Sequence, residues 1–136
     1  MTKIATDIVQ SKKLAEILPI ESADMYYWCG EQIRIGSHKA MDKDLDIPCW
    51  SLATLINLLP SEFTEKGKYS ETTYKIDIRK YALTDDVDTY QIAYGNYIFY
   101  EDGNSSWKDM INTGEKEELI DAVFQMICWL KENNKL

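Results

Sequence analysis

The spacing of apolar residues changes near the middle of the chain, and this change limits the folds open to it. Between residues 72 and 79, Tyr and Ile alternate with charged residues, which is typical of an antiparallel strand with one face in water. Residues 90–94 and 97–100 are rich in Tyr, Ile and Phe, which favour strands. Gly95-Asn96 stands between them as a two-residue hairpin turn, so we expect two adjacent antiparallel strands here.

The N-terminal part of the chain indicates a helix instead. Residues 7–18 combine apolar side chains with charged ones, and Pro19 follows directly, as it does where an amphipathic helix ends. Either Thr6 or Ser11 supplies the N-cap oxygen. We therefore expect a helix that starts near residue 7 and stops before Pro19.

Two further helices are predicted. Residues 48–59 begin with one proline and are followed by another, and proline is tolerated in the first turn of a helix because no intrahelical bond needs its N–H there. Ser51 is a second place for this helix to begin, and Asp46 is expected to help cap it. Residues 115–133 begin with three glutamates and carry apolar residues on more than one face, which indicates a core helix on the sheet.

The rest of the chain supplies turns and another hairpin. Residues 25–35 contain two β-favouring runs around a glycine-containing turn, the pattern of a hairpin. Residues 37–46 and 61–71 are polar and are expected to be loops, and Asp102-Gly103 marks a turn out of the sheet. This inventory predicts an α+β fold: an antiparallel sheet of hairpins packed against about three helices, with the C-terminal helix as the core helix. The 136 residues are expected to form a single domain.

The charge and the cysteine content of the chain indicate which partners it can bind and in which compartment it is found. The chain carries 15 Lys and Arg against 23 Asp and Glu, a formal net charge of −8, whereas phosphate backbones are bound by clustered basic residues. We therefore expect no direct binding of nucleic acid. No stretch is as long and apolar as a membrane span. Three widely spaced cysteines (Cys29, Cys49 and Cys128) are typical of reduced thiols, which predicts a cytoplasmic protein.

The spacings of a metal or catalytic site are not met. The spacing of Asp42, Asp44 and Asp46 matches the first ligand positions of a calcium-binding loop. Ile47, however, occupies the position where that loop needs glycine, and Ala53 the position where it needs a bidentate glutamate. Zinc sites need pairs of Cys or His at close spacing, and a nucleophilic site would have to recruit a cysteine and the single histidine. From the sequence we assign no catalytic residue, no metal ligand and no cofactor.

Tyrosine is the most conspicuous residue type. Nine Tyr are present, and seven of them lie between residues 69 and 100. Tyr90 and Tyr94 share one face of a strand, and Tyr97 follows on the next expected strand. Tyr is enriched at protein interfaces because it supplies a large contact area at low entropy cost, so these three form a candidate protein-contact face. The alternative is that they cover the half-buried face of an ordinary sheet.

Three segments resemble a known group of proteins. Residues 10–25 (QSKKLAEILPIESADM), 46–60 (DIPCWSLATLINLLP) and 119–130 (LIDAVFQMICWL) are similar, in this order, to small uncharacterised proteins encoded by phages and prophages of gut bacteria. The resemblance implies a setting in the host cytoplasm, with a host or phage protein as partner. It carries over no catalytic position.

These observations predict a non-enzymatic protein-interaction module of phage or mobile-element origin. Two alternatives stay open: an acidic mimic of DNA that inhibits a host enzyme acting on DNA, and a small enzyme whose site is assembled from distant residues. A homodimer formed through a free sheet edge or through the Tyr face also stays open.

Overall fold

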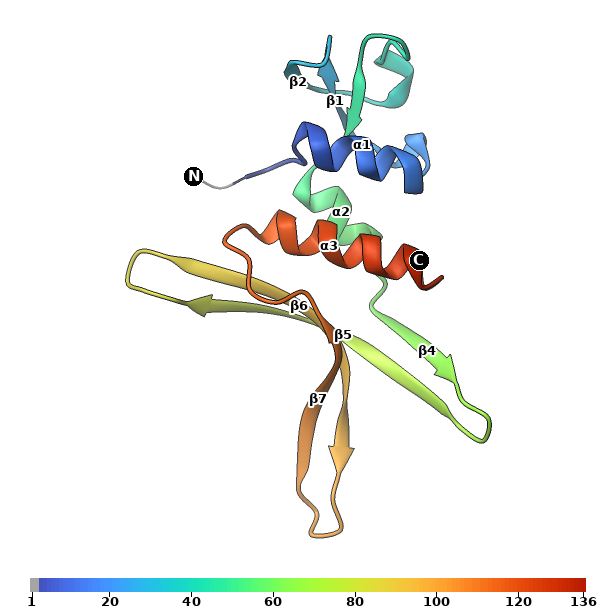
Figure 1. Ribbon diagram of the computed structural model, residues 1–136, viewed down its shortest axis with the longest axis vertical. Helices are drawn as coiled ribbons and strands as arrows, with labels where there is room; N and C mark the ends of the chain where they lie inside the picture. The colour runs from blue at the N-terminus through green and yellow to red at the C-terminus, as the bar shows by residue number, and fades with distance from the viewer. Residues whose placement is uncertain (1–2) are drawn as a thin grey trace.

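The computed structural model describes residues 3–136 and has the predicted α+β fold. Over this range it contains three α-helices, two short 3-10 helices and two antiparallel sheets, one of three strands and one of four. The α-helices lie between the two sheets (Figure 1). The elements are α1 (Ile8–Ile17), η1 (Ile20–Ser22), β1 (Met25–Trp28), β2 (Gln32–Ile35), η2 (His38–Ala40), β3 (Ile47–Cys49), α2 (Leu52–Leu58), β4 (Glu62–Lys66), β5 (Glu71–Ala82), β6 (Asp88–Phe99), β7 (Ser105–Asn112) and α3 (Leu119–Glu132).

Helix α1 confirms the predicted amphipathic helix, but its cap is a different residue. The N-cap is Asp7, whose carboxylate accepts a hydrogen bond from the backbone N–H of Gln10 at 2.7 Å. The Gln10 side chain in turn accepts one from the Asp7 backbone N–H, so both N–H groups are satisfied by a capping box. The expected caps, Thr6 and Ser11, are wrong because their hydroxyl groups are buried and bond to each other at 2.8 Å.

Helix α2 is shorter than predicted because the first residues of the expected helix form a strand. β1 and β2 make the expected hairpin, and β3 pairs with the other edge of β1, with Pro48 opposite Tyr26. Proline is tolerated at this position because β3 is an edge strand. The helix begins after Ser51, whose hydroxyl accepts the Thr54 N–H. A helix start at Pro48 and a cap from Asp46 are therefore both wrong.

The four-stranded sheet, ordered β4-β5-β6-β7, differs most from the prediction. Gly95-Asn96 is not a turn, since β6 runs through it without interruption. Gly95 is required for space: a Cβ at this position would overlap the carbonyl oxygen of Lys108 and lie 2.9 Å from the Trp107 ring. The register between β6 and β7 shifts at the same point. The glycine therefore marks a β-bulge in place of a hairpin turn.

Two strands of this sheet lie where none was predicted. β4 occupies part of the expected loop at 61–71, and β7 follows the Asp102-Gly103 turn, which returns the chain to the sheet instead of leading out of it. Phe63 is the one buried residue of β4, and β7 has none. Neither segment therefore has a clear alternation of apolar and polar residues from which a strand could be predicted.

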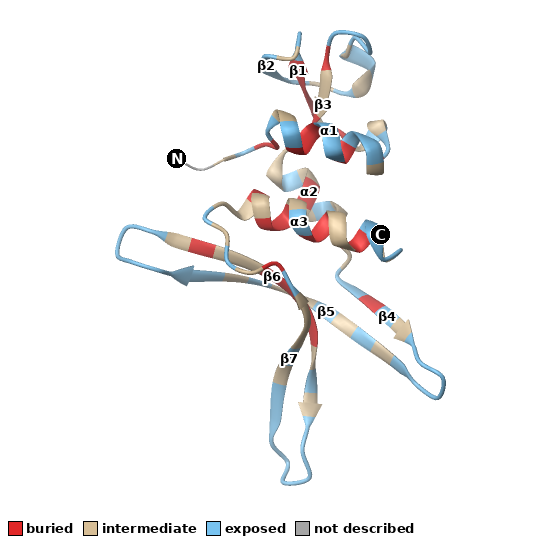
Figure 2. Ribbon diagram, viewed as in Figure 1, coloured by how far each residue is buried: buried red, intermediate tan, exposed pale blue. Residues whose placement is uncertain are grey.

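All four strands meet only near the centre of the sheet, and three two-stranded ribbons extend from it (Figure 1). β4 pairs with residues 71–75 of β5, whereas β6 pairs with residues 75–82 of the same strand. Beyond Gly95, β6 pairs with β7 instead. The helices lie over the centre of the sheet, and the far ends of the β4–β5, β5–β6 and β6–β7 ribbons are mostly exposed (Figure 2).

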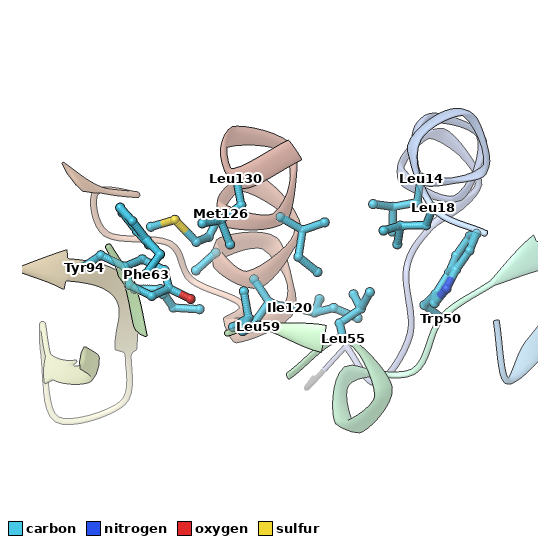
Figure 3. Packing of buried hydrophobic residues seen from close by; sticks show 14 of the residues in the cluster. Leu14, Leu18, Trp50, Leu55, Leu59, Phe63, Tyr94, Ile120, Met126 and Leu130 are labelled. Atoms are coloured by element: carbon cyan, nitrogen blue, oxygen red, sulfur yellow. The ribbon is translucent and has the colours of Figure 1, made fainter. Parts of the chain in front are cut away.

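Helix α3 packs on the four-stranded sheet as the core helix, as predicted. Tyr94 and Phe63 lie on one side of it, and Leu14 and Leu55 lie on the other (Figure 3). The helix starts at Leu119, later than predicted, because the segment before it forms a backbone bridge with β6. Tyr94, Phe63, Leu14 and Leu55 belong to one hydrophobic core cluster, to which α3 contributes the buried residues Ile120, Ala122, Val123, Met126, Ile127 and Leu130.

Candidate protein-contact face

The structure separates the three tyrosines of the predicted contact face. Tyr94 is fully buried, and its hydroxyl donates a hydrogen bond to the carbonyl oxygen of Pro60 at 2.6 Å. Tyr94 is part of the hydrophobic core, and its burial raises the pKa of its hydroxyl. Tyr90 is half-buried, and its backbone forms a bridge with Lys116. Of the three, Tyr97 is the one that is largely exposed, at 59%, and placed to contact a partner.

Tyr97 lies on the face of the four-stranded sheet that points away from α3, which we call the outer face. The assignment follows from the register of β5 and β6. Ile76 and Tyr94 lie opposite each other and pack in the core, so the residues next to them along the strands point the other way. The outer face comprises Lys75, Asp77 and Arg79 of β5, Tyr97 and Phe99 of β6, and Trp107 and Asp109 of β7.

Aromatic side chains gather on the part of the outer face that belongs to the β6–β7 ribbon. Tyr97 is paired with Trp107 in register, and the two rings meet edge to face at 5.4 Å. Phe99, two residues further along, is 78% exposed. Neighbouring aromatic residues left in water are typical of an interaction site. We call Tyr97, Phe99 and Trp107 the aromatic cluster.

Phe99 and Trp107 were not among the residues predicted for the contact face. The predicted strand over residues 97–100 already places Tyr97 and Phe99 on one face by the two-residue period, but only tyrosines were considered. Trp107 could not be added from the sequence, since its strand was not predicted.

The charged part of the outer face is an internally bonded network. The Arg79 guanidinium donates to both carboxylate oxygens of Asp109, with Nη1 at 2.9 Å, and its Nε donates to Asp77 at 2.8 Å. The Trp107 Nε1–H also donates to Asp109, at 2.7 Å. The hydrogen bonds from Arg79 hold the pKa of Asp109 below its ordinary value. Because the guanidinium is already engaged on both sides, it is a poor anchor for an anionic ligand.

Two open hollows cross the outer face where the ribbons diverge. One of about 520 Å³ is lined by Lys75, Ile76, Asp77, Arg79, Tyr97 and Trp107. The other, of about 300 Å³, is lined by Thr73, Lys75, Asn96, Tyr97, Phe99 and Trp107. Neither lining contains a cysteine or a histidine. The hollows therefore offer an aromatic contact surface beside the charged side chains of Lys75, Asp77 and Arg79.

The cysteines and the histidine considered for nucleophilic catalysis lie elsewhere. Cys49 is buried on β3, not on a helix as expected, and Cys128 is half-buried on α3. Burial raises the pKa of both thiols, which keeps them protonated and poorly nucleophilic. Cys29 is exposed in the turn after β1, and His38 begins the short helix η2.

The acidic residues singled out in the sequence have local partners. Asp46 accepts hydrogen bonds from the backbone N–H groups of Cys29 and Asp42, both at 2.8 Å. Glu118 accepts the backbone N–H of Lys3 at 3.0 Å. Within residues 3–136, no group of three or more His, Cys, Asp or Glu side chains is arranged to hold a metal ion. In the same range, every helix is too short or too polar to cross a membrane.

In comparisons with known proteins, no family model, curated protein or solved structure matches the chain.

Proposed function

We propose that this protein is a non-enzymatic interaction module that binds another protein through the outer face of its four-stranded sheet. The observation that carries the proposal is the aromatic cluster of Tyr97, Phe99 and Trp107 on a ribbon that projects from the core. An isolated two-stranded ribbon is marginally stable in water. Covering a side chain such as Phe99 contributes roughly 1.5–3 kcal/mol, so a bound partner would stabilise both the ribbon and the complex.

The composition of the face also supports contact with protein. Interface residues that carry most of the binding energy are enriched in Trp, Tyr and Arg, and the outer face presents Tyr97, Trp107 and Arg79 within one continuous surface. Arg79 is fixed by its two carboxylate partners, so little side-chain entropy is lost when the face is covered.

The two alternative functions have less support. An enzyme would need reactive groups that converge in a pocket, but of the charged residues that line the hollows, Lys75, Asp77 and Arg79, the last two are bonded to each other. A mimic of DNA would need carboxylates lined up to face a basic groove, whereas the acidic residues of the outer face, Asp77 and Asp109, are engaged by Arg79 within the chain. From the resemblance, we propose in addition that the partner is a phage or host protein met in the cytoplasm.

Site-specific photo-cross-linking tests the proposal. One variant carries p-benzoylphenylalanine at Phe99, and a matched control carries it at Val9 on α1, because these side chains are 78% and 79% exposed. After irradiation in cells, we expect a covalent adduct with a protein from position 99 and little from position 9. Equal yields from the two positions, or no protein adduct from position 99, would overturn the proposed function.

A further inference from the structure

The chain exposes more surface than a compact protein of its size. Its accessible area is 8756 Å², whereas a folded monomer of 15.8 kDa exposes about 7,300 Å². The excess, roughly 1,400 Å², is in the range that one subunit buries in a large stable dimer. Figure 2 shows that the ends of the three ribbons are exposed along much of their length, so the ribbons supply much of this excess.

The centre of the outer face is close to electrically neutral, although the chain as a whole carries −8. Lys75, Asp77, Arg79 and Asp109 are two cations and two anions. Arg79 is bonded to the carboxylates of Asp77 and Asp109, and its side chain is only 19% exposed. Covering a charged network is tolerated when its members are paired and hydrogen-bonded. Two copies of this acidic chain can therefore meet at this face with little net repulsion, because Arg79 already neutralises its two carboxylates in each copy.

The turns at the two ends of β5 have opposite charge. In the turn of the β4–β5 ribbon, Lys68 adds a positive charge beyond the ion pair of Lys66 and Glu71. In the turn of the β5–β6 ribbon, Asp85 and Asp86 add negative charges beyond the ion pair of Lys80 and Asp88. The two turns lie at opposite ends of the sheet (Figure 1), and β5 has 12 residues. The charges are therefore separated by at least about 40 Å.

We propose that the partner of the outer face is a second copy of this chain, which binds through the same face so that β5 of one copy runs antiparallel to β5 of the other. A two-fold axis near Ile76 and Asp77, in the middle of β5, places the positive turn of each copy on the negative turn of the other. Both contacts then form at once, as an isologous interface requires. The two sheets pack face to face, about 10 Å apart, and the aromatic clusters of both copies are withdrawn from water.

This inference rests on the proposed function, because it names the occupant of the same face. A different protein would have to present two charges of opposite sign, about 40 Å apart, on either side of a neutral aromatic surface. The chain itself has this arrangement, which favours self-association over an unrelated partner.

Charge reversal with rescue tests the proposal by sedimentation equilibrium. We expect the wild-type protein to have twice the 15.8 kDa monomer mass at micromolar concentration. Variant one is Lys66→Glu/Lys68→Glu and variant two is Asp85→Lys/Asp86→Lys. Each should dimerise roughly tenfold more weakly by itself, because both turn contacts become repulsive. An equimolar mixture of the two variants should regain the wild-type affinity, because each reversed turn then meets its opposite.

The control variant makes the same charge change at Lys12 and Lys13, which are exposed on α1, and should dimerise like the wild type. A monomeric wild-type protein would overturn the proposal. So would a dimer that the reversals leave unchanged, or reversals that weaken it without rescue by mixing. The cross-linking experiment separates the two proposals. If position 99 forms an adduct with a different protein and none with a second copy of the chain, the proposed dimer is overturned, but the proposed contact face is supported.

Discussion

Replacing Gly95 with alanine tests why glycine is needed in β6 opposite the bulge of β7. The backbone φ of Gly95 is not in the positive range, so the cost of an added methyl group is steric and not conformational. The methyl group would overlap a backbone carbonyl oxygen of β7 and lie 2.9 Å from the Trp107 ring. That ring cannot move freely, since its Nε1–H is bonded to Asp109.

The size of the effect follows from these contacts. Overpacking at a well-packed position costs about 1–3 kcal/mol, and we expect the upper end because both neighbours are fixed. The unfolded chain loses conformational freedom when glycine becomes alanine, which offsets about 0.4–1 kcal/mol. The free energy of unfolding of Gly95→Ala should therefore fall by about 2 kcal/mol, which lowers the Tm by roughly 7 °C for a chain of this length.

Urea unfolding followed by tryptophan fluorescence and circular dichroism measures this change. Gly103→Ala is the control, because Gly103 has a φ of +85° and nothing within 4 Å of an added Cβ. It should lose only about 1 kcal/mol, from the left-handed backbone conformation. If Gly95→Ala is as stable as the wild type, or no less stable than Gly103→Ala, the close approach of β7 to Gly95 is not real.

Three further predictions concern single side chains. Hydrogen bonds from Arg79 lower the pKa of Asp109 below 3.8, so this interaction stabilises the folded state at neutral pH and is lost as pH falls through the lowered pKa. Asp109→Asn should therefore reduce the free energy of unfolding by about 2 kcal/mol at pH 7 and by progressively less below about pH 4. If the difference in free energy between wild type and variant does not change with pH, the ion pair does not stabilise the folded state. Tyr94→Phe leaves a backbone carbonyl without its 2.6 Å hydrogen bond and should cost about 1–2 kcal/mol in urea unfolding, whereas an unchanged midpoint would mean that water replaces the hydroxyl. Thiol labelling read by mass spectrometry should modify exposed Cys29 in the folded protein and buried Cys49 only after unfolding, and equal rates would show that β3 opens readily.

Local patterns were enough to predict most of the secondary structure. The proline after residue 18 and the glutamates before α3 act within one helical turn, so α1 and α3 were found with ends correct to within a few residues. The β1–β2 hairpin was found for the same reason, since its turn is coded by adjacent residues.

The errors occurred where one local pattern suits two structures. Proline fits both the first turn of a helix and an edge strand, and at Pro48 the pairing with β1 decides in favour of the strand. Gly-Asn fits both a hairpin turn and a bulge, and at Gly95 the decision comes from β7, which follows later in the chain. Contacts between distant segments are not visible in a single sequence.

The contact face was only partly predictable for the same reason. Residue type alone singled out Tyr94 and Tyr97 equally, yet one is fully buried and the other is 59% exposed. They differ because Tyr97 lies three residues beyond Tyr94 on one continuous strand, so the two side chains point to opposite faces of the sheet, and α3 packs over the face that carries Tyr94.

The bulge at Gly95 also accounts for the shape of the outer face. A β-bulge bends the strand and increases its local twist, and in the structure the β6–β7 ribbon leaves the direction of the β5–β6 ribbon at this point (Figure 1). The bend opens the hollow between the ribbons and sets Tyr97 and Trp107 beside Arg79. Gly95→Ala should therefore reduce cross-linking from position 99 even at temperatures where the variant is fully folded, whereas Gly103→Ala should preserve it. If both variants cross-link like the wild type, the aromatic cluster does not depend on the bulge for its position.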